Sequence, residues 1–190
     1  MSIGLIIGII LAVVVVIVIA VVVWFVGGQN RLVHAEELCG NALSQIGVQQ
    51  ASRWDALNTL ADLTKGYSDQ EYNTLMQTIR ARQGISPKSS AKEVEEQEAM
   101  IQQGIGRINA LAEAYPDLKS NTLYLKTMDE VKNHEDNVRM SRMVYNDTVT
   151  KYNRLVRSLP GSLLAGGLGF APRDYLQQDP AKADMPVLAR

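Results

Sequence analysis

The sequence predicts an all-α fold: an N-terminal transmembrane helix followed by an antiparallel bundle of about four helices, two long and two shorter. Residues 3–26 contain no charged side chain, and downstream of them apolar residues recur at steps of three and four. That spacing places them on one face of a helix, and no stretch shows the strict alternation of a half-buried strand. We expect three parts: residues 1–28 as a transmembrane anchor, residues 29–160 as the bundle, and residues 161–190 as an apolar membrane-proximal segment with a polar C-terminal tail.

The apolar run at residues 3–26 is long enough to cross a membrane. At 1.5 Å per residue, a helix of this length is roughly 36 Å long, against about 30 Å of hydrocarbon in a bilayer. Trp24 and Phe25 lie at its C-terminal end, where aromatic rings favour the headgroup layer. A cleaved signal peptide would have a basic start and a shorter apolar core, and both are absent. We therefore expect a retained single-pass anchor in a bacterial-type cell membrane.

The first long helix of the bundle is expected to cover residues 30–65. One of its faces follows a heptad pattern and is mostly apolar, but it is interrupted by Glu36, Gln50 and Arg53. Residues 27–28, both glycine, precede this helix. Because glycine disfavours helix by about 1 kcal/mol relative to alanine, we interpret the pair as a swivel between the anchor and the bundle.

Two shorter helices should follow, over residues 69–82 and 91–115. A Ser-x-x-Glu capping box opens each of them, at residues 68–71 and 90–93. In such a box the hydroxyl and the carboxylate each accept a backbone N–H at the start of the helix. Acidic residues at the start of the third helix complement the helix dipole, and we interpret them as a solvent-exposed surface. These residues are Glu93, Glu95, Glu96 and Glu98.

The second long helix is expected over residues 121–159. Pro160 and Gly161 then end it, and its apolar face is interrupted by two charges, Glu135 and Arg142. Apolar and aromatic residues occupy the rest of this face at alternating steps of three and four. The two long helices therefore have the same design, an apolar stripe with a few charges in it.

These charges predict an ion pair inside the bundle. Short loops make neighbouring helices antiparallel, so the two long helices run in opposite directions. If residues 30 and 159 lie level, Arg53 lies opposite Glu135 to within one residue. We predict that Arg53 and Glu135 form a buried pair, which adds little stability but specifies the register of the helices. The alternative is that the charges line a ligand site.

The same topology returns the end of the last helix to the bilayer. Between residues 148 and 173 there are four basic residues and no acidic one. A basic surface near anionic headgroups gains about 1 kcal/mol per charge. The apolar residues 163–170 would then rest on the bilayer, although a loop that merely closes the end of the bundle explains them as well. The expected membrane-proximal residues are Lys151, Arg154, Arg157, Leu163, Leu164 and Phe170.

The composition points away from catalysis and from nucleic-acid binding. The net charge of −1 gives no strong field for a polyanion. The two histidines, His34 and His134, are far apart in sequence and form no metal-binding motif. Cys39 is the one cysteine, and it lies on the apolar face of the first long helix without an obvious base nearby. We predict no catalytic residue, no metal and no cofactor.

Short motifs along the chain carry a resemblance to a known family. The most specific are Ala-Tyr-Pro-Asp-Leu-Lys at residues 114–119, Tyr-Asn at 145–146 and 152–153, Glu135, Arg142, and Pro160 leading into the glycine-rich residues 163–170. Further matches are Asn-Arg-Leu-Val at residues 30–33, Ile-Gly-Val-Gln at 46–49 and Lys-Gly-Tyr at 65–67. With these motifs the chain resembles the LemA family over nearly its whole length. The departures lie in the first long helix and directly before it, where Gln29 stands in place of a family tyrosine.

The resemblance implies one membrane span followed by a helical bundle, with no known catalytic activity. One relative is associated with magnetosome membrane formation, which implies a membrane-organising role. We therefore predict a non-enzymatic, membrane-anchored scaffold with the lipid bilayer and further copies of itself as partners. Gly4 and Gly8 support self-association, because small residues four apart let two spans approach closely. The alternative is a membrane-tethered binding module or receptor for a peptide, a protein or a lipid, with a partner still to be identified.

The charges beside the span predict its orientation. Arg31 follows the span, whereas the two-residue segment before it carries no basic side chain. Basic residues favour the cytoplasmic side of a membrane. We therefore expect the bundle to face the cytoplasm.

Overall fold

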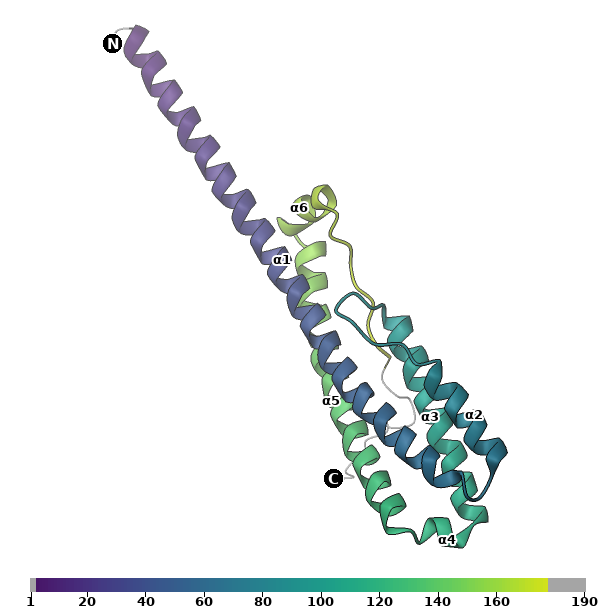
Figure 1. Ribbon diagram of the computed structural model, residues 1–190. Helices are drawn as coiled ribbons and strands as arrows, with labels where there is room; N and C mark the ends of the chain where they lie inside the picture. Colours follow the sequence, from purple (N-terminus) through teal and green to yellow (C-terminus); the bar gives the residue numbers. More distant parts are fainter. Residues whose placement is uncertain (1–2, 178–190) are drawn as a thin grey trace, which may run out of the picture. The chain divides into compact units, whose positions relative to one another are not determined.

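Helices are the only regular secondary structure in the computed structural model, which describes residues 3–177 (Figure 1). The all-α prediction is therefore confirmed for this part of the chain. The helices are α1 (Ile3–Thr64), α2 (Asp69–Arg80), α3 (Ala91–Ala114), α4 (Pro116–Lys119), α5 (Thr122–Arg157) and α6 (Gly161–Leu168).

The described residues pack into two compact units. One, which we call the anchor unit, is drawn from residues 3–38 and 150–173. The other, the core unit, is drawn from residues 39–149 and 174–177. Helices α1 and α5 contribute to both units. The boundaries expected at residues 28 and 160 concern the membrane surface and stay predictions.

In the anchor unit, α1 continues through Gly27 and Gly28 without a break. The expected swivel is therefore wrong, since both glycines lie inside a helix. Gly28 has a packing role: the side chain of Leu164, from α6, occupies the position that a Cβ at Gly28 would need. The close approach of α6 thus explains a small residue at position 28. At Gly27 a Cβ would meet nothing within 4 Å.

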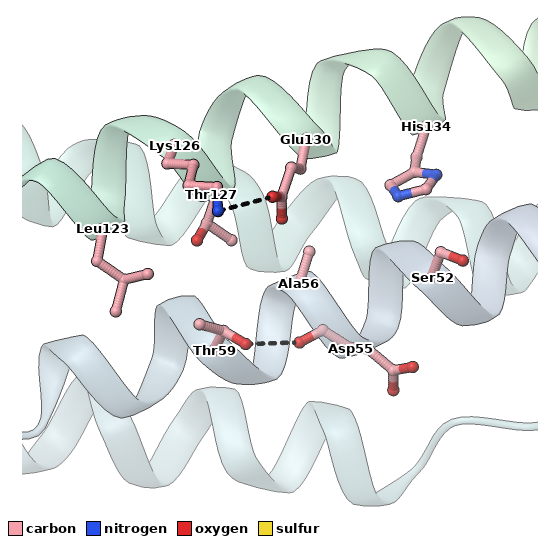
Figure 2. Close-up of a pocket in the computed structure, with 9 residues that line it drawn as sticks. All are labelled: Ser52, Asp55, Ala56, Thr59, Leu123, Lys126, Thr127, Glu130 and His134. Atoms are coloured by element: carbon pink, nitrogen blue, oxygen red, sulfur yellow. Dashed lines mark hydrogen bonds and ion pairs between the residues drawn. The ribbon is translucent and has the colours of Figure 1, made fainter.

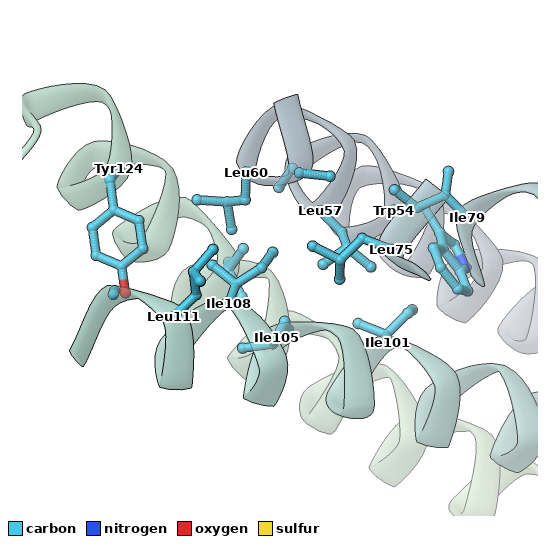
Figure 3. Packing of buried hydrophobic residues seen from close by; sticks show 14 of the residues in the cluster. Trp54, Leu57, Leu60, Leu75, Ile79, Ile101, Ile105, Ile108, Leu111 and Tyr124 are labelled. Carbon is cyan, nitrogen blue, oxygen red and sulfur yellow. The ribbon is translucent and has the colours of Figure 1, made fainter. Parts of the chain in front are cut away.

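The core unit is built around an apolar cluster contributed by several helices (Figure 3). Leu57 of α1 is fully buried and lies directly over Gly104 of α3, where a Cβ would come within 2.8 Å of it. Burying one such side chain stabilises the fold by about 1.5–3 kcal/mol. Among the buried members of the cluster are Trp54, Leu57, Leu60, Leu75, Ile79, Ile101, Ile105, Ile108, Leu111 and Tyr124, which Figure 3 labels.

The helix starts follow the local signals in the sequence. At α3 the capping box is complete, because the Ser90 hydroxyl accepts from the Glu93 N–H at 3.2 Å and the Glu93 carboxylate accepts from the Ser90 N–H at 2.7 Å. At α2 the Ser68 hydroxyl accepts from the Glu71 N–H at 3.3 Å. These bonds satisfy N–H groups that a helix start would otherwise leave without partners.

Candidate functional site

The most deeply buried charge of the core unit is Arg53 of α1, whose side chain is 0% exposed. Its Nη1 donates to both carboxylate oxygens of Glu98, from α3, at 2.6 and 2.7 Å. The structure thus gives Arg53 the partner Glu98. The pair of Arg53 with Glu135 that helix register suggests stays a prediction. The register argument compared only the two long helices, and Glu98 was interpreted as one of the solvent-exposed acids at the start of the third helix. The Glu98 side chain is in fact only 17% exposed.

Amide side chains complete the surroundings of this pair. Gln102 donates to Glu98 at 3.2 Å, and the Gln50 amide donates to Glu98 at 3.4 Å and to the Val94 carbonyl at 3.3 Å. Burial by itself would raise the pKa of Glu98, but the charge and hydrogen bonds of Arg53, together with Gln102, lower this pKa below its usual value. The Glu98 carboxylate is therefore held ionised inside the core unit.

Two nitrogens of Arg53, Nε and Nη2, are buried without a hydrogen-bond partner among the described residues. The Gln50 Oε1 atom is in the same condition. Buried donors and acceptors without partners cost about 1–3 kcal/mol each. The pair therefore specifies how α1 and α3 pack more than it stabilises them.

A second polar cluster of the core unit holds the extended residues 174–177 against α5. The Asn146 side chain makes two bonds to Leu176: its Nδ2 donates to the carbonyl at 2.8 Å, and its Oδ1 accepts from the N–H at 2.9 Å. Tyr145 donates to the Asp174 carbonyl at 3.1 Å, and Arg142 donates to the Gln177 carbonyl at 2.7 Å.

One acidic side chain from α3 completes this cluster, since Glu95 accepts from the Gln177 N–H at 2.9 Å. The Leu176 side chain is 1% exposed and is therefore buried in the core unit. We call Glu95, Arg142, Tyr145 and Asn146 the core clamp. All of its hydrogen bonds to residues 174–177 go to main-chain atoms, so it recognises an extended backbone with one apolar anchor.

The anchor unit contains a similar arrangement one heptad further along α5. Asn153 donates to the Arg173 carbonyl and accepts from the Arg173 N–H, both at 2.9 Å, and Tyr152 donates to the Ala171 carbonyl at 2.9 Å. The Arg173 side chain reaches Glu36 of α1 at 3.4 Å. Tyr-Asn pairs at the same heptad position of α5 thus bind main-chain atoms in each unit.

An open groove of about 370 Å³ lies between α1 and α5 in the core unit (Figure 2). Its charged lining residues are Asp55, Lys126 and Glu130, and Lys126 pairs with Glu130 at 3.9 Å. His134 lies at one end, where its Nδ1 is 3.2 Å from the Gln49 Oε1. The Ser52 hydroxyl, which lines the groove, donates to the Val48 carbonyl at 3.3 Å. Within residues 3–177 there is no group of three His, Cys, Asp or Glu side chains that could hold a metal.

Comparison with known proteins identifies the chain. The model of the LemA family matches residues 42–188. The chain belongs to the LemA family. A LemA protein of Metamycoplasma hominis is 31% identical over 133 residues, which cover 68% of this chain and 59% of that protein.

Two further relatives carry a magnetosome name. Magnetosome protein MamQ 2 of Paramagnetospirillum magneticum is 32% identical over 84 residues, covering 44% of this chain and 30% of that protein. MamQ of Magnetospirillum gryphiswaldense is 30% identical over 84 residues, with the same coverage. The chain thus spans 59% of the LemA relative and 30% of each MamQ protein.

The Tyr-Asn pairs that carried the LemA resemblance are the residues that bind the chain after α6. From the sequence they served only as a family signature, and their role was missed. Their spacing was a usable signal, because positions seven apart lie on one helix face and an amide has both a donor and an acceptor to satisfy.

Most of the expected membrane-proximal residues lie in the anchor unit as exposed side chains. Lys151, Arg154 and Arg157 are exposed at the end of α5, and Leu163 is 68% exposed. Leu164 is buried against Gly28, so its side chain packs inside the anchor unit and is not exposed to lipid. Phe170 is half-buried. Contact of this surface with the bilayer stays a prediction.

One described helix, α1, is long and apolar enough to cross a membrane, and its apolar window is not buried within the chain. Its exposed side chains from Ile7 to Val26 are almost all aliphatic. This composition suits lipid rather than water. With the family match, it makes the chain a membrane-associated protein of the LemA type.

Proposed function

We propose that this LemA-family protein is a non-enzymatic, membrane-anchored scaffold that self-associates and so organises the membrane around it. The observation that carries the proposal is an exposed apolar stripe on α5 in the core unit. Met140, Met143 and Val144 are 57%, 53% and 57% exposed. Residues at these spacings lie on one helix face. Contiguous exposed apolar surface is typical of interaction sites, and methionine adapts to different partners.

The span supports the same proposal. At Gly4 and at Gly8 a Cβ would meet nothing within 4 Å, so this small-residue face of α1 is open to another helix. Small residues four positions apart allow close packing of two spans. The magnetosome proteins among the relatives support a membrane-organising role for the assembled protein.

The size of the full chain in detergent or lipid nanodiscs tests self-association. We expect an oligomer by light scattering, and we expect the combined variant Met140→Ser, Met143→Ser and Val144→Ser to shift it towards monomer. Leu123→Ser is the matched control, because Leu123 is 46% exposed and lies near the start of α5, several turns away from Met140. A wild-type chain that is strictly monomeric would contradict the proposal.

We further propose that the bundle faces the cytoplasm. Arg31, with the basic end of α5, supports this orientation through the positive-inside rule. Lys88 lies exposed in the loop between α2 and α3, and the native Cys39 is buried, so Lys88→Cys supplies one reactive thiol. We expect a membrane-impermeant maleimide to label this variant only after the cells are permeabilised. Labelling of intact cells would show that the bundle faces the outside of the cytoplasmic compartment and would contradict this proposal.

The core clamp favours a second candidate function, a membrane-tethered binding module for an extended peptide. A clamp that binds main-chain atoms and one leucine is suited to this task. Capture experiments with the detergent-solubilised full chain test it. The module requires a defined partner that the wild-type chain retains and Asn146→Ala loses. Retention of the partner by both chains would place binding elsewhere.

A further inference from the structure

We propose that the core clamp is a peptide-binding site, which residues 174–177 of the same chain occupy in this structure and which residues 174–177 of a second copy occupy in the assembled protein. The inference rests on the self-association proposed above. It names residues 174–177 as the segment that two copies exchange and the core clamp as the site that receives it. No part of the clamp belongs to the open groove between α1 and α5.

The contacts of the clamp are those of a peptide site. Five hydrogen bonds join four side chains to the main chain of residues 174–177. Leu176 is buried, whereas its neighbour Tyr175 is 48% exposed. Leu176 is the one buried residue of this segment, since Asp174 and Gln177 are exposed as well, so the segment has a single apolar anchor. Recognition through main-chain bonds and one apolar pocket is a recurring mode of peptide binding.

The chain reaches the clamp without regular secondary structure of its own. Helix α6 ends at Gly169, which has a φ of 81°, and no helix or strand follows as far as residue 177. Residues 174–177 are therefore not fixed by a helical or sheet hydrogen-bond ladder. Their release breaks five hydrogen bonds to side chains of α3 and α5, and each of these bonds can be remade with another copy.

Three features favour a second copy as the occupant. Every copy carries the same Leu176 and the same main-chain groups, so the exchanged contact is chemically identical to the internal one, which makes exchange a low-cost route to association. Met143 and Val144 lie between Arg142 and Tyr145 in sequence and expose apolar surface that a neighbouring copy would cover. The span also confines the copies to one membrane, which raises their effective concentration.

Cross-linking between differently tagged copies tests the exchange. One copy carries Glu95→Cys and the other Gln177→Cys, since these residues are in contact in the structure. Both full-length chains are reconstituted together in phospholipid vesicles and treated with a short bismaleimide. We expect dimers that contain both tags, about tenfold more abundant than with Glu96→Cys in place of Glu95→Cys. Glu96 is the matched control because its side chain is 59% exposed and lies one position away.

Further variants separate the possible outcomes. A chain with both Glu95→Cys and Gln177→Cys should close on itself, and Asn146→Ala in the Glu95→Cys copy should abolish the mixed dimer. If the double variant closes on itself while the mixture gives no more dimer than the Glu96 control, exchange is wrong. Self-association then stands or fails separately, on the light-scattering size. If neither forms, the Glu95–Gln177 contact is wrong and the inference is overturned with it.

Discussion

Two arginine–glutamate pairs, one in each unit, show how strongly burial changes the meaning of the same contact. In the core unit, Arg53 and Glu98 are 2.6 Å apart with side chains 0% and 17% exposed. In the anchor unit, Arg173 and Glu36 are 3.4 Å apart with side chains 23% and 44% exposed. Water can replace the partner of an exposed charge, but it cannot reach Arg53. The buried pair is therefore expected to be intolerant of losing one member, and the exposed pair nearly indifferent to it.

The two units are alike, by contrast, in how they bind the chain after α6. The amide side chains of Asn146 and Asn153 each donate to the carbonyl and accept from the N–H of one residue. That residue is Leu176 for Asn146 and Arg173 for Asn153. These bonds are neutral, so they carry no large desolvation cost. The comparison separates two kinds of polar contact: a buried charge pair that specifies packing, and neutral amide side chains that bind main-chain atoms.

The largest expected effect is that of breaking the buried pair from one side. Arg53→Met leaves the Glu98 carboxylate in a mostly buried site without its counter-charge, which should destabilise the chain by about 3 kcal/mol. The thermal unfolding midpoint of the full chain, measured in one detergent, reports this loss. Arg53→Met combined with Glu98→Leu removes both charges and should recover most of the stability.

Equal losses in the single and the double variant would contradict the buried pair. The same cycle tests the proposal that Glu135 also interacts with Arg53, as the helix register suggests. For that, Glu135→Leu is combined with Arg53→Met. Strictly additive losses would remove Glu135 from the pair, because coupled residues deviate from additivity by about 0.5–3 kcal/mol.

The next effect concerns the clamps. Asn146→Asp keeps the acceptor for the Leu176 N–H but loses the donor to its carbonyl, which should cost about 1–2 kcal/mol of local stability. Amide hydrogen exchange at Leu176 measures it, and Asn153→Asp should act likewise on Arg173. Asn137→Asp, at an exposed position of α5, is the control. Unchanged protection at Leu176 in Asn146→Asp would show that the amide does not hold this segment.

The sequence predicted the elements that depend on local signals. The capping box at Ser90 placed the start of α3, and Pro160 placed the end of α5 to within a few residues. Apolar spacing predicted one apolar face on each long helix, and on these faces the structure buries Leu57 and Val131, among others. These features are encoded within one turn or one face, so they can be read without knowledge of the tertiary contacts.

The parts that sequence missed depend on contacts between distant residues. Residues 161–168 are rich in glycine and have low helix propensity, yet they form α6, in which Leu164 packs on Gly28. Glu98 resembled any solvated acid until α1 brought Arg53 against it. The segment after α6, residues 171–177, is held by side chains of α5 rather than by the backbone hydrogen bonds of a helix or a sheet. Such a segment needs no periodic spacing of apolar residues, so its sequence gives no signal of where it lies. Tertiary contact decided each of these cases.

Acid should weaken the buried pair of Arg53 and Glu98 in the wild-type chain. The pKa of Glu98 is lowered in the folded chain, so its contribution to stability is present above the ordinary glutamate pKa, about 4.3, and is lost as the pH falls through the folded value. Unfolding midpoints between neutral and acidic pH should therefore fall more steeply for the wild type than for Arg53→Met with Glu98→Leu. Parallel profiles of the two chains would show that Glu98 is not held ionised by Arg53.

The smallest effect is expected at the exposed pair of the anchor unit. Glu36→Gln removes the carboxylate that Arg173 meets at 3.4 Å, but the backbone of Arg173 remains bound to Asn153. Both charged side chains are partly in water, so the loss should be about 0.2–1 kcal/mol and should shrink as salt is added. Unfolding midpoints at low and high salt measure it. A loss as large as that of Arg53→Met would mean that burial does not distinguish the two pairs, because solvent exposure is the property in which they differ most.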